Sequence, residues 1–377
     1  MAHHQFIECS RSSKLLIFLS ATGTAEGVFN FWNIGQAFAA TENVLMVQGW
    51  ANTWYQDGVR GLGEGLDGTI AAINDWCDAR GITDIICIGQ SMGGYGALLF
   101  SALLGERARA IAFAAEPILG LPHSRFERLF AKAALPKRRK NPYRSLAEAF
   151  PVGLRGVLMV GEREPLDVYS AHLLKDVPGL EIRSVRLASH SVIGYLRGRG
   201  VLMDFLRSLV GTGKLPHLPY YGTALEAEGF PEAYYKGWCA LRDRNSDVAV
   251  AHLLEAVRLQ PVNDQARFLL GKAYEQYGDD VAALAQYSIA HTLSSRNDAA
   301  VAAAGCLRRK GHLREALYMV KSVTNRAPDD AVAHYQAALC NQMLGNRKSA
   351  QRHLERCVEI DPVNKAYSAR LKSLARA

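Results

Sequence analysis

The chain has 377 residues and a formal net charge of +8, with 49% hydrophobic and 21% charged residues. This composition is typical of soluble globular domains and excludes a largely disordered chain. The length is greater than one ordinary hydrophobic core requires, so we expect two domains.

The basic net charge is compatible with an anionic partner, or with a solvated surface that happens to be basic. No nucleic-acid recognition motif accompanies the charge, so we expect no nucleic-acid partner. Apolar stretches are too short to span a bilayer, and residues 1–13 lack the apolar segment of a secretion signal. We therefore expect a cytoplasmic protein without a membrane span.

The seven cysteines include no C-x-x-C pair. His353 and Cys357 share a face of a predicted helix, but two candidate ligands do not complete a metal site. We interpret the cysteines as small buried side chains in a reducing compartment, and we expect neither a metal nor a cofactor.

Up to residue 210, apolar runs of strand length alternate with helical patterns. This alternation predicts an α/β domain, a doubly wound and mostly parallel sheet covered by helices. The last strand alternates in polarity, as an edge strand does. The predicted strands are Lys14–Ser20, Asn43–Gly49, Asp84–Gly89, Arg109–Ala114, Gly156–Gly161 and Glu181–Ala188; the predicted helices are Gly63–Arg80, Gly93–Leu104, Val168–Lys175 and Val192–Leu209.

A longer insert at residues 116–155 interrupts this alternation. It carries nine Lys and Arg residues, among them Arg125 and the run Lys137–Lys140, against three Glu residues. Inserts of this length commonly form lids or binding loops. The alternative is a solvated helical hairpin without a special role.

Residues 211–229 are rich in Gly and Pro, which predicts a linker. From residue 230 to 377 the pattern is helical, with Pro261, Ser295, Pro328 and Pro362 spaced by about 34 residues. Small and aromatic residues recur at matching places, most clearly at Gly271, Tyr274, Ala283, Tyr287 and Ala290. This pattern resembles tetratricopeptide (TPR) repeats. Lys365–Arg376 is then expected as a terminal capping helix.

The motif G-x-S-x-G occurs at Gly89–Gly93. It follows an apolar strand and opens a helix, where the serine would lie in a tight, strained turn. The motif and the order of elements resemble the α/β-hydrolases over residues 1–210. The resemblance implies that Ser91 is a nucleophile that attacks an acyl carbonyl.

In that family the histidine follows the last strand and the acid follows the strand before it. The position of that histidine, after the last strand, corresponds to His190 in this chain. For the acid we favour Asp167, at the start of a helix, with Glu164 as the alternative. The backbone N–H of Met92 and a loop residue, Ala21 or Thr22, are the expected oxyanion-hole donors.

These residues predict a serine hydrolase acting on a small ester or thioester, with the repeats binding a protein partner or a second copy. One alternative is an O-acyltransferase or O-acetyltransferase acting on a polysaccharide, for which the basic insert would suit an anionic glycan acceptor. A second alternative, of another class, is a TPR interaction or scaffold protein whose hydrolase-like domain is vestigial.

Overall fold

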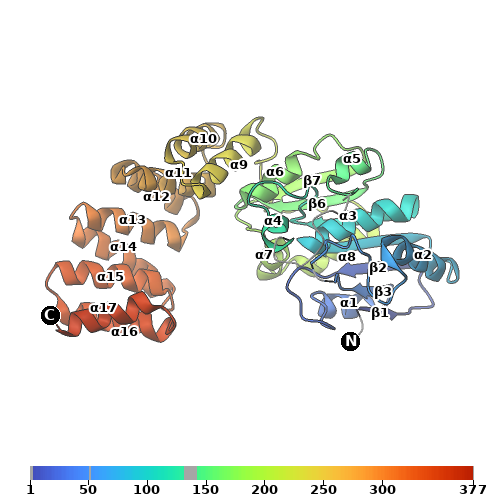
Figure 1. Cartoon of the computed structure of the whole chain (residues 1–377), viewed down its shortest axis with the longest axis horizontal. Helices are drawn as coiled ribbons and strands as arrows, with labels where there is room; N and C mark the ends of the chain where they lie inside the picture. Colours follow the sequence, from blue (N-terminus) through green and yellow to red (C-terminus); the bar gives the residue numbers. More distant parts are fainter. Residues whose placement is uncertain (1–2, 51, 131–141, 377) are drawn as a thin grey trace. The chain divides into compact units, whose positions relative to one another are not determined.

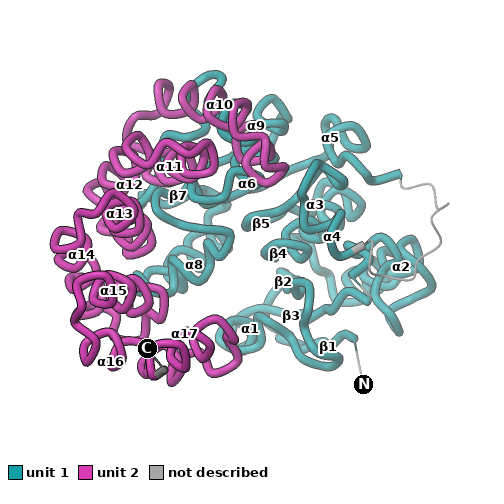
Figure 2. The backbone as a smooth tube through the Cα atoms, turned by 60° about the vertical axis from the view of Figure 1, so that its left-hand side comes forward, with its two compact units in different colours: residues 1–235 teal, residues 236–377 magenta. Residues whose placement is uncertain are grey.

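The structure is a computed structural model that describes residues 3–50, 52–130 and 142–376 (Figure 1). It divides into two compact units, Met1–Tyr235 and Lys236–Ala377 (Figure 2). Unit 1 is built on a sheet and unit 2 is helical. The boundary falls inside helix α9, Phe230–Arg242, so the first turn and a half of this helix belongs to unit 1.

Unit 1 contains, among its described residues, a seven-stranded sheet with the order β1-β3-β2-β4-β5-β6-β7. The first strand is antiparallel to its neighbour and all other pairs are parallel. The predicted α/β class is therefore confirmed. The strands are β1 His4–Ile7, β2 Lys14–Leu19, β3 Asn43–Val47, β4 Asp84–Gln90, β5 Ala108–Phe113, β6 Gly156–Gly161 and β7 Leu180–Val185.

Successive side chains of a strand point to opposite sides of the sheet. Helices cover both sides, so the sheet is buried on both faces. Leu15 and Ile17 pack toward one core and Leu16 and Phe18 toward the other. The first core also receives side chains from α2 Gly65–Asp78, α3 Met92–Leu104 and α6 Pro165–His172. The second receives them from α1 Trp32–Phe38, α7 Val192–Gly198 and α8 Leu202–Thr212.

Parallel pairing brings the carboxyl ends of the strands to one edge of the sheet. Gln90 pairs with Phe113, and Gly161 pairs with Val185. The segments that follow β4, β5, β6 and β7 therefore begin side by side, which is where open α/β sheets place their sites.

Several features of unit 1 differ from the sequence predictions or add to them. Strand β1 was not predicted, since four residues are too few for a clear pattern. The helix expected at residues 192–209 is two helices, α7 and α8, separated at Gly200, whose φ of +74° suits glycine. The insert contains two short helices, α4 Arg125–Phe130 and α5 Leu146–Ala149, while its basic run Lys137–Lys140 lies outside the described residues.

The segment 211–229 was expected to be an interdomain linker. Residues 211 and 212 end α8, and the segment after them is hydrogen-bonded to the edge strand β7 and to Arg186 directly after it. Gly222 N donates to Ser184 O at 2.9 Å, and Arg186 N donates to Tyr220 O at 2.8 Å. Its aromatic residues Tyr220 and Tyr221 pack against the second core. The apolar side chains among the Gly and Pro residues explain why this segment joins unit 1.

Unit 2 is a helical repeat region in which each helix from α10 onward packs on the next. Small residues allow close approach: a Cβ at Gly271 would lie 2.6 Å from the Tyr287 ring, and one at Gly237 would lie 2.6 Å from Leu253 Cγ. The helices after α9 are α10 Ser246–Leu259, α11 Asp264–Tyr277, α12 Asp280–Ser294, α13 Asn297–Arg309, α14 Leu313–Arg326, α15 Ala331–Met343, α16 Arg347–Ile360 and α17 Lys365–Arg376.

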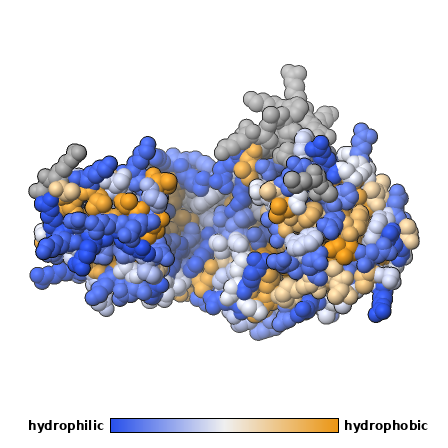
Figure 3. Space-filling model, turned by 90° about the horizontal axis from the view of Figure 1, so that it is seen from below, coloured by the Kyte–Doolittle hydropathy of each residue, from blue (hydrophilic) through white to orange (hydrophobic). Residues whose placement is uncertain are grey.

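The surface seen in Figure 3 is largely hydrophilic, with apolar residues in small groups. Within the described ranges, no helix combines the length and the apolar character that crossing a bilayer requires. Each of the seven cysteines has a free thiol, and five of them are buried. Burial raises the pKa of Cys77 to about 11, which keeps this thiol protonated and unreactive at neutral pH.

Candidate active site

Ser91 occupies a strained turn between β4 and α3. Its φ of 59° and ψ of −124° lie in a region that residues other than glycine rarely adopt. The turn is so tight that a Cβ at Gly89 would lie 2.1 Å from Gly93 O, and a Cβ at Gly93 would lie 2.1 Å from Leu19 O. Both glycines of the G-x-S-x-G motif are therefore required by the backbone itself.

The start of α3 leaves backbone donors next to Ser91. Ser91 N donates to Phe113 O at 2.9 Å, which holds the turn against β5. Met92 is the first residue of α3, and no residue that the structure describes accepts its N–H. This N–H, at the positive end of the helix, can stabilise a negative oxygen beside Ser91.

Buried Asp167 and half-buried His190 form a hydrogen-bonded pair. Asp167 Oδ2 lies 2.7 Å from His190 Nδ1, and the Asp167 side chain is 0% exposed. Asp167 lies in the first turn of α6, after β6, and His190 follows β7. A carboxylate that accepts the Nδ1 proton leaves Nε2 as the basic nitrogen of a neutral imidazole. His190 Nε2 is buried and has no hydrogen-bond partner among the described residues.

The Ser91 turn and the His190 loop are neighbours at the same edge of the sheet. Gln90 Oε1, from the residue before Ser91, accepts a hydrogen bond from Ile193 N at 3.1 Å. Ile193 lies in the first turn of α7, and Val192 N donates to His190 O. A direct hydrogen bond between the Ser91 hydroxyl and His190 Nε2 is not formed in this structure; in many enzymes this bond tightens only with substrate.

Glu164, the alternative acid, has a different partner. Its Oε2 lies 3.1 Å from Arg125 Nη2, and it makes no hydrogen bond to His190. Burial raises the pKa of the Glu164 carboxyl above its ordinary value, and the nearby Asp167 carboxylate raises it further. Of the two candidate acids, Asp167 is the one that contacts the imidazole.

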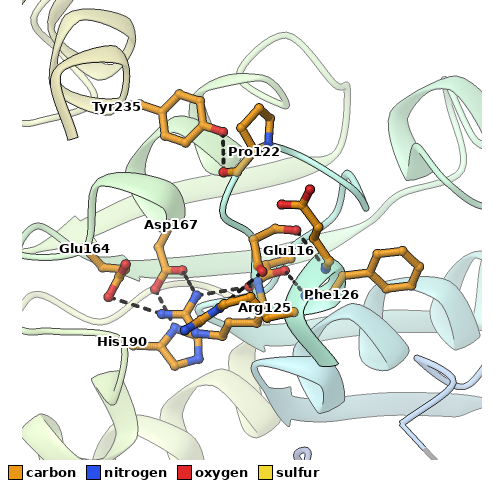
Figure 4. Close-up of polar contacts among 11 residues, drawn as sticks. Glu116, Pro122, Arg125, Phe126, Glu164, Asp167, His190 and Tyr235 are labelled. Carbon is orange, nitrogen blue, oxygen red and sulfur yellow. Dashed lines mark hydrogen bonds and ion pairs between the residues drawn. The ribbon is translucent and has the colours of Figure 1, made fainter. Parts of the chain in front are cut away.

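Arg125 lies at the centre of a cluster of carboxylates that the sequence patterns did not indicate (Figure 4). Its Nη1 lies 3.1 Å from both Glu116 Oε1 and Asp167 Oδ1. Together with Glu164 this makes three carboxylates around one guanidinium. Burial alone would lower the pKa of Arg125, but the three carboxylates outweigh it and raise the pKa. The sequence grouped Arg125 with the basic insert, whereas its charge is directed inward.

The loop donors of the expected oxyanion hole are only partly suitable. Ala21 N donates to Asn30 Oδ1 at 2.7 Å, so its hydrogen is already used and the assignment of Ala21 is wrong. The same Asn30 oxygen accepts from the Thr24 hydroxyl at 2.7 Å, which closes the loop on itself. Thr22 lies half-buried within this loop. The sequence patterns did not indicate that the side chain of Asn30, nine residues further along the chain, accepts this hydrogen bond.

Among the described residues, no group of three or more His, Cys, Asp or Glu side chains is placed so that it could hold a metal ion. His353 Nδ1 lies 2.9 Å from His334 Nδ1, while Cys357 Sγ donates to Ala331 O. The two side chains that shared a helix face in the sequence therefore have separate partners.

Comparison with known proteins identifies no family: no family model and no curated protein matches the chain. Solved structures that resemble it include MamA from Desulfovibrio magneticus RS-1, 20% identical over 39% of this chain and 84% of that chain, with a TM-score of 0.37. YrrB, described as a TPR protein with an unusual peptide-binding site, is 21% identical over 48% of this chain and 88% of that chain, with a TM-score of 0.36. Human IFIT1 with PPP-AAAA is 20% identical over 56% of this chain and 46% of that chain, with a TM-score of 0.33. The repeat architecture of unit 2 rests on its own helices, described above.

Proposed function

We propose that unit 1 is a serine-dependent acyl-transfer enzyme of the α/β-hydrolase type, which hydrolyses a small carboxylic ester or thioester through an acyl-enzyme. One observation carries the proposal: a fully buried Asp167 holds His190 at 2.7 Å, beside the strained turn that presents Ser91. A buried carboxylate bonded to an imidazole needs a reason, because burying the charge is costly.

The topology supports the same assignment. Ser91 follows the central strand β4, in a sheet whose one antiparallel strand lies at an edge. The acid and the histidine follow β6 and β7, in the order serine, acid, histidine that this class of enzyme uses.

The reaction assigns one task to each group. His190 Nε2 removes the proton of Ser91 as its oxygen attacks the acyl carbonyl, and Asp167 stabilises the imidazolium that forms. The Met92 N–H stabilises the tetrahedral oxyanion. His190 then protonates the leaving alcohol or thiol, and water attacks the acyl-enzyme by the same route in reverse.

A second function belongs to unit 2. We propose that its repeats bind a protein partner or a second copy of the chain, since helical repeats present an extended surface and contain no catalytic motif of their own. The peptide-binding site named for YrrB is compatible with this role. Transfer to an anionic glycan gains no support from Arg125, because this residue is already neutralised by carboxylates.

A fluorophosphonate probe tests the nucleophile. The wild-type chain should be labelled, and Ser91→Ala should not be. Ser101→Ala is the matched control, since Ser101 lies on α3, the helix that follows Ser91, and its hydroxyl is buried and bonded to Leu98 O. An unlabelled wild-type chain would refute catalysis and favour the alternative of an interaction or scaffold protein with a vestigial hydrolase-like domain.

Turnover of a short acyl ester tests the acid. Asp167→Asn should lower kcat on the order of 10⁴-fold, as in other triads. Glu164→Gln should have a much smaller effect. The reverse ranking would assign the acid to Glu164. Product analysis with an added polysaccharide separates the two chemistries, because a hydrolase forms the free acid whether or not the glycan is present.

A further inference from the structure

Asp167 receives hydrogen bonds from two different side chains on its two oxygens. Oδ2 faces His190 Nδ1 at 2.7 Å, and Oδ1 faces Arg125 Nη1 at 3.1 Å. The carboxylate is 0% exposed, so bulk solvent does not reach it. The position of the guanidinium therefore determines the plane of the carboxylate that His190 meets.

Arg125 is itself held firmly from the other side. Glu116 Oε1 accepts from both the Arg125 guanidinium and Arg125 N, each at 3.1 Å, and Glu116 Oε2 accepts from Phe126 N at 3.1 Å. Glu116 is buried and follows β5. Its carboxylate thus occupies the start of α4, where two backbone donors lack helical acceptors.

The surroundings of Arg125 argue against a role in binding an anionic substrate. The side chain is only 16% exposed, and it contacts three carboxylates. An additional anion would have to displace one of these partners from a buried site, which is costly. The guanidinium is better suited to neutralise the cluster than to capture a ligand.

We propose that Arg125 is a positioning residue for the catalytic acid, through which Glu116 and the start of α4 orient Asp167 toward His190. This inference rests on the proposed function. It differs from the general triad scheme because the positioning charge comes from the insert, about forty residues before the acid in the chain. The correct position of α4 is then required for Asp167 to hold His190 in the orientation that catalysis needs.

The charge balance around His190 gives a readout that a purely structural role would not change. The charged groups facing the imidazole are Asp167 from α6, Glu164 directly before α6, Arg125 from α4 and, behind it, Glu116 after β5. Removing the guanidinium leaves the carboxylates less neutralised, which favours the imidazolium. The titration midpoint of His190 should then move to higher pH.

The experiment compares Arg125→Gln with Arg128→Gln in the full-length chain. Arg128 lies on the same helix and bonds only to Ser124 O among the contacts of its guanidinium that the structure gives. The midpoint is measured by NMR titration of histidine Cε1–H, assigned with His190→Gln, and separately from the pH dependence of fluorophosphonate labelling. Arg125→Gln should raise the midpoint on the order of one pH unit, and Arg128→Gln should not change it.

Charge compensation supplies the second arm. In Arg125→Gln/Glu164→Gln one carboxylate is lost with the guanidinium, so the midpoint should return toward the wild-type value. Should Arg125→Gln fail to fold, Glu164→Gln alone is informative, because loss of a nearby negative charge should lower the midpoint. Identical midpoints in the wild-type chain and in these variants would overturn the inference. A shifted NMR midpoint in a chain that the probe does not label would refute the enzyme proposal and retain Arg125 only as the residue that orients Asp167 against His190.

Discussion

The hydroxyl group of Tyr235 donates a hydrogen bond to the carbonyl oxygen of Pro122, 2.9 Å away (Figure 4). The Tyr235 ring also stacks on Tyr169, with the ring centroids 4.4 Å apart. Pro122 leads into α4, which carries Arg125, and Tyr169 lies on α6, which carries Asp167. One side chain at the start of α9 thus connects both segments that hold the carboxylate cluster.

Tyr235→Phe should keep the ring stacking and lose the hydrogen bond. We expect the free energy of unfolding of unit 1 to fall by about 1 kcal/mol, the usual net value of one such bond. Hydrogen exchange of the β6 amides measures it. Tyr318→Phe is the control, since Tyr318 is 80% exposed; an equal loss in both variants would contradict the assignment.

Gly93→Ala should disrupt the turn that carries Ser91. The new Cβ would lie 2.1 Å from Leu19 O, a backbone atom that cannot move without shifting β2. We expect a loss of about 3 kcal/mol or more in the free energy of unfolding, measured by urea denaturation.

Gly211→Ala is the matched control for Gly93→Ala. Gly211 lies in α8 with open space around its Cα, so alanine should stabilise the protein by about 0.5 to 1 kcal/mol. Tolerance of alanine at residue 93 would show that the turn is looser than described.

Ser91→Gly should relieve the backbone strain of the turn, because glycine accepts a φ of 59° without penalty. We expect this variant to be more stable than Ser91→Ala by about 1 kcal/mol, although neither can be labelled by a fluorophosphonate. Thermal unfolding of the two variants side by side measures the difference. Equal stabilities would mean that the serine carries no strain.

Glu164 should make the stability of unit 1 depend on pH. Its pKa is raised in the folded state, first by burial and then by Asp167, so the folded chain binds this proton more tightly than the unfolded chain. Stability is therefore greatest below the ordinary glutamate value and falls as the pH rises through the folded pKa.

Glu164→Gln should lack this fall, so its advantage over the wild-type chain should grow with pH. Urea denaturation across the acid range tests this, with Glu106→Gln, at a side chain that is 92% exposed, as the control. A constant difference between Glu164→Gln and the wild-type chain would contradict the raised pKa.

The pair His334 and His353 should affect unit 2 in the opposite direction. The pKa of His353 is lowered, by burial first and then by His334, whose Nδ1 lies 2.9 Å away. The unfolded chain then binds the proton more tightly, so stability is lost as the pH falls below the ordinary value of 6.5. His353→Gln should reduce this loss, measured by hydrogen exchange in α15 and α16.

His312→Gln provides the comparison for His353→Gln, because the His312 side chain is 60% exposed. It should leave the pH dependence of α15 and α16 unchanged. An effect equal to that of His353→Gln would assign the pH dependence to general charge rather than to the histidine pair.

Much of the fold was predictable because its signals are local. The strand β4 is a run of apolar residues, and the turn after it requires glycine at residues 89 and 93, so neighbouring residues encode both. The repeat spacing in unit 2 likewise follows from small residues at a regular interval. Strand β1 was missed because its four residues acquire their role only by pairing with β3.

The carboxylate cluster was not predictable in the same way. Glu164 and Asp167 are three residues apart at one helix end, and local pattern does not distinguish their partners. Their different environments come from Arg125 and His190, which approach from segments 42 and 23 residues distant from Asp167. Ala21 was misassigned for the same reason, since Asn30 takes its N–H.

The sequence by itself determined the alternation of strands and helices, the tight turn at Ser91 and the helical repeats, because periodicity and glycine geometry act between residues close in the chain. Only the tertiary structure decided which carboxylate meets His190 and where the charge of Arg125 is directed. Those choices depend on which side chains share a buried space, and that space forms only when the strands have assembled into the sheet.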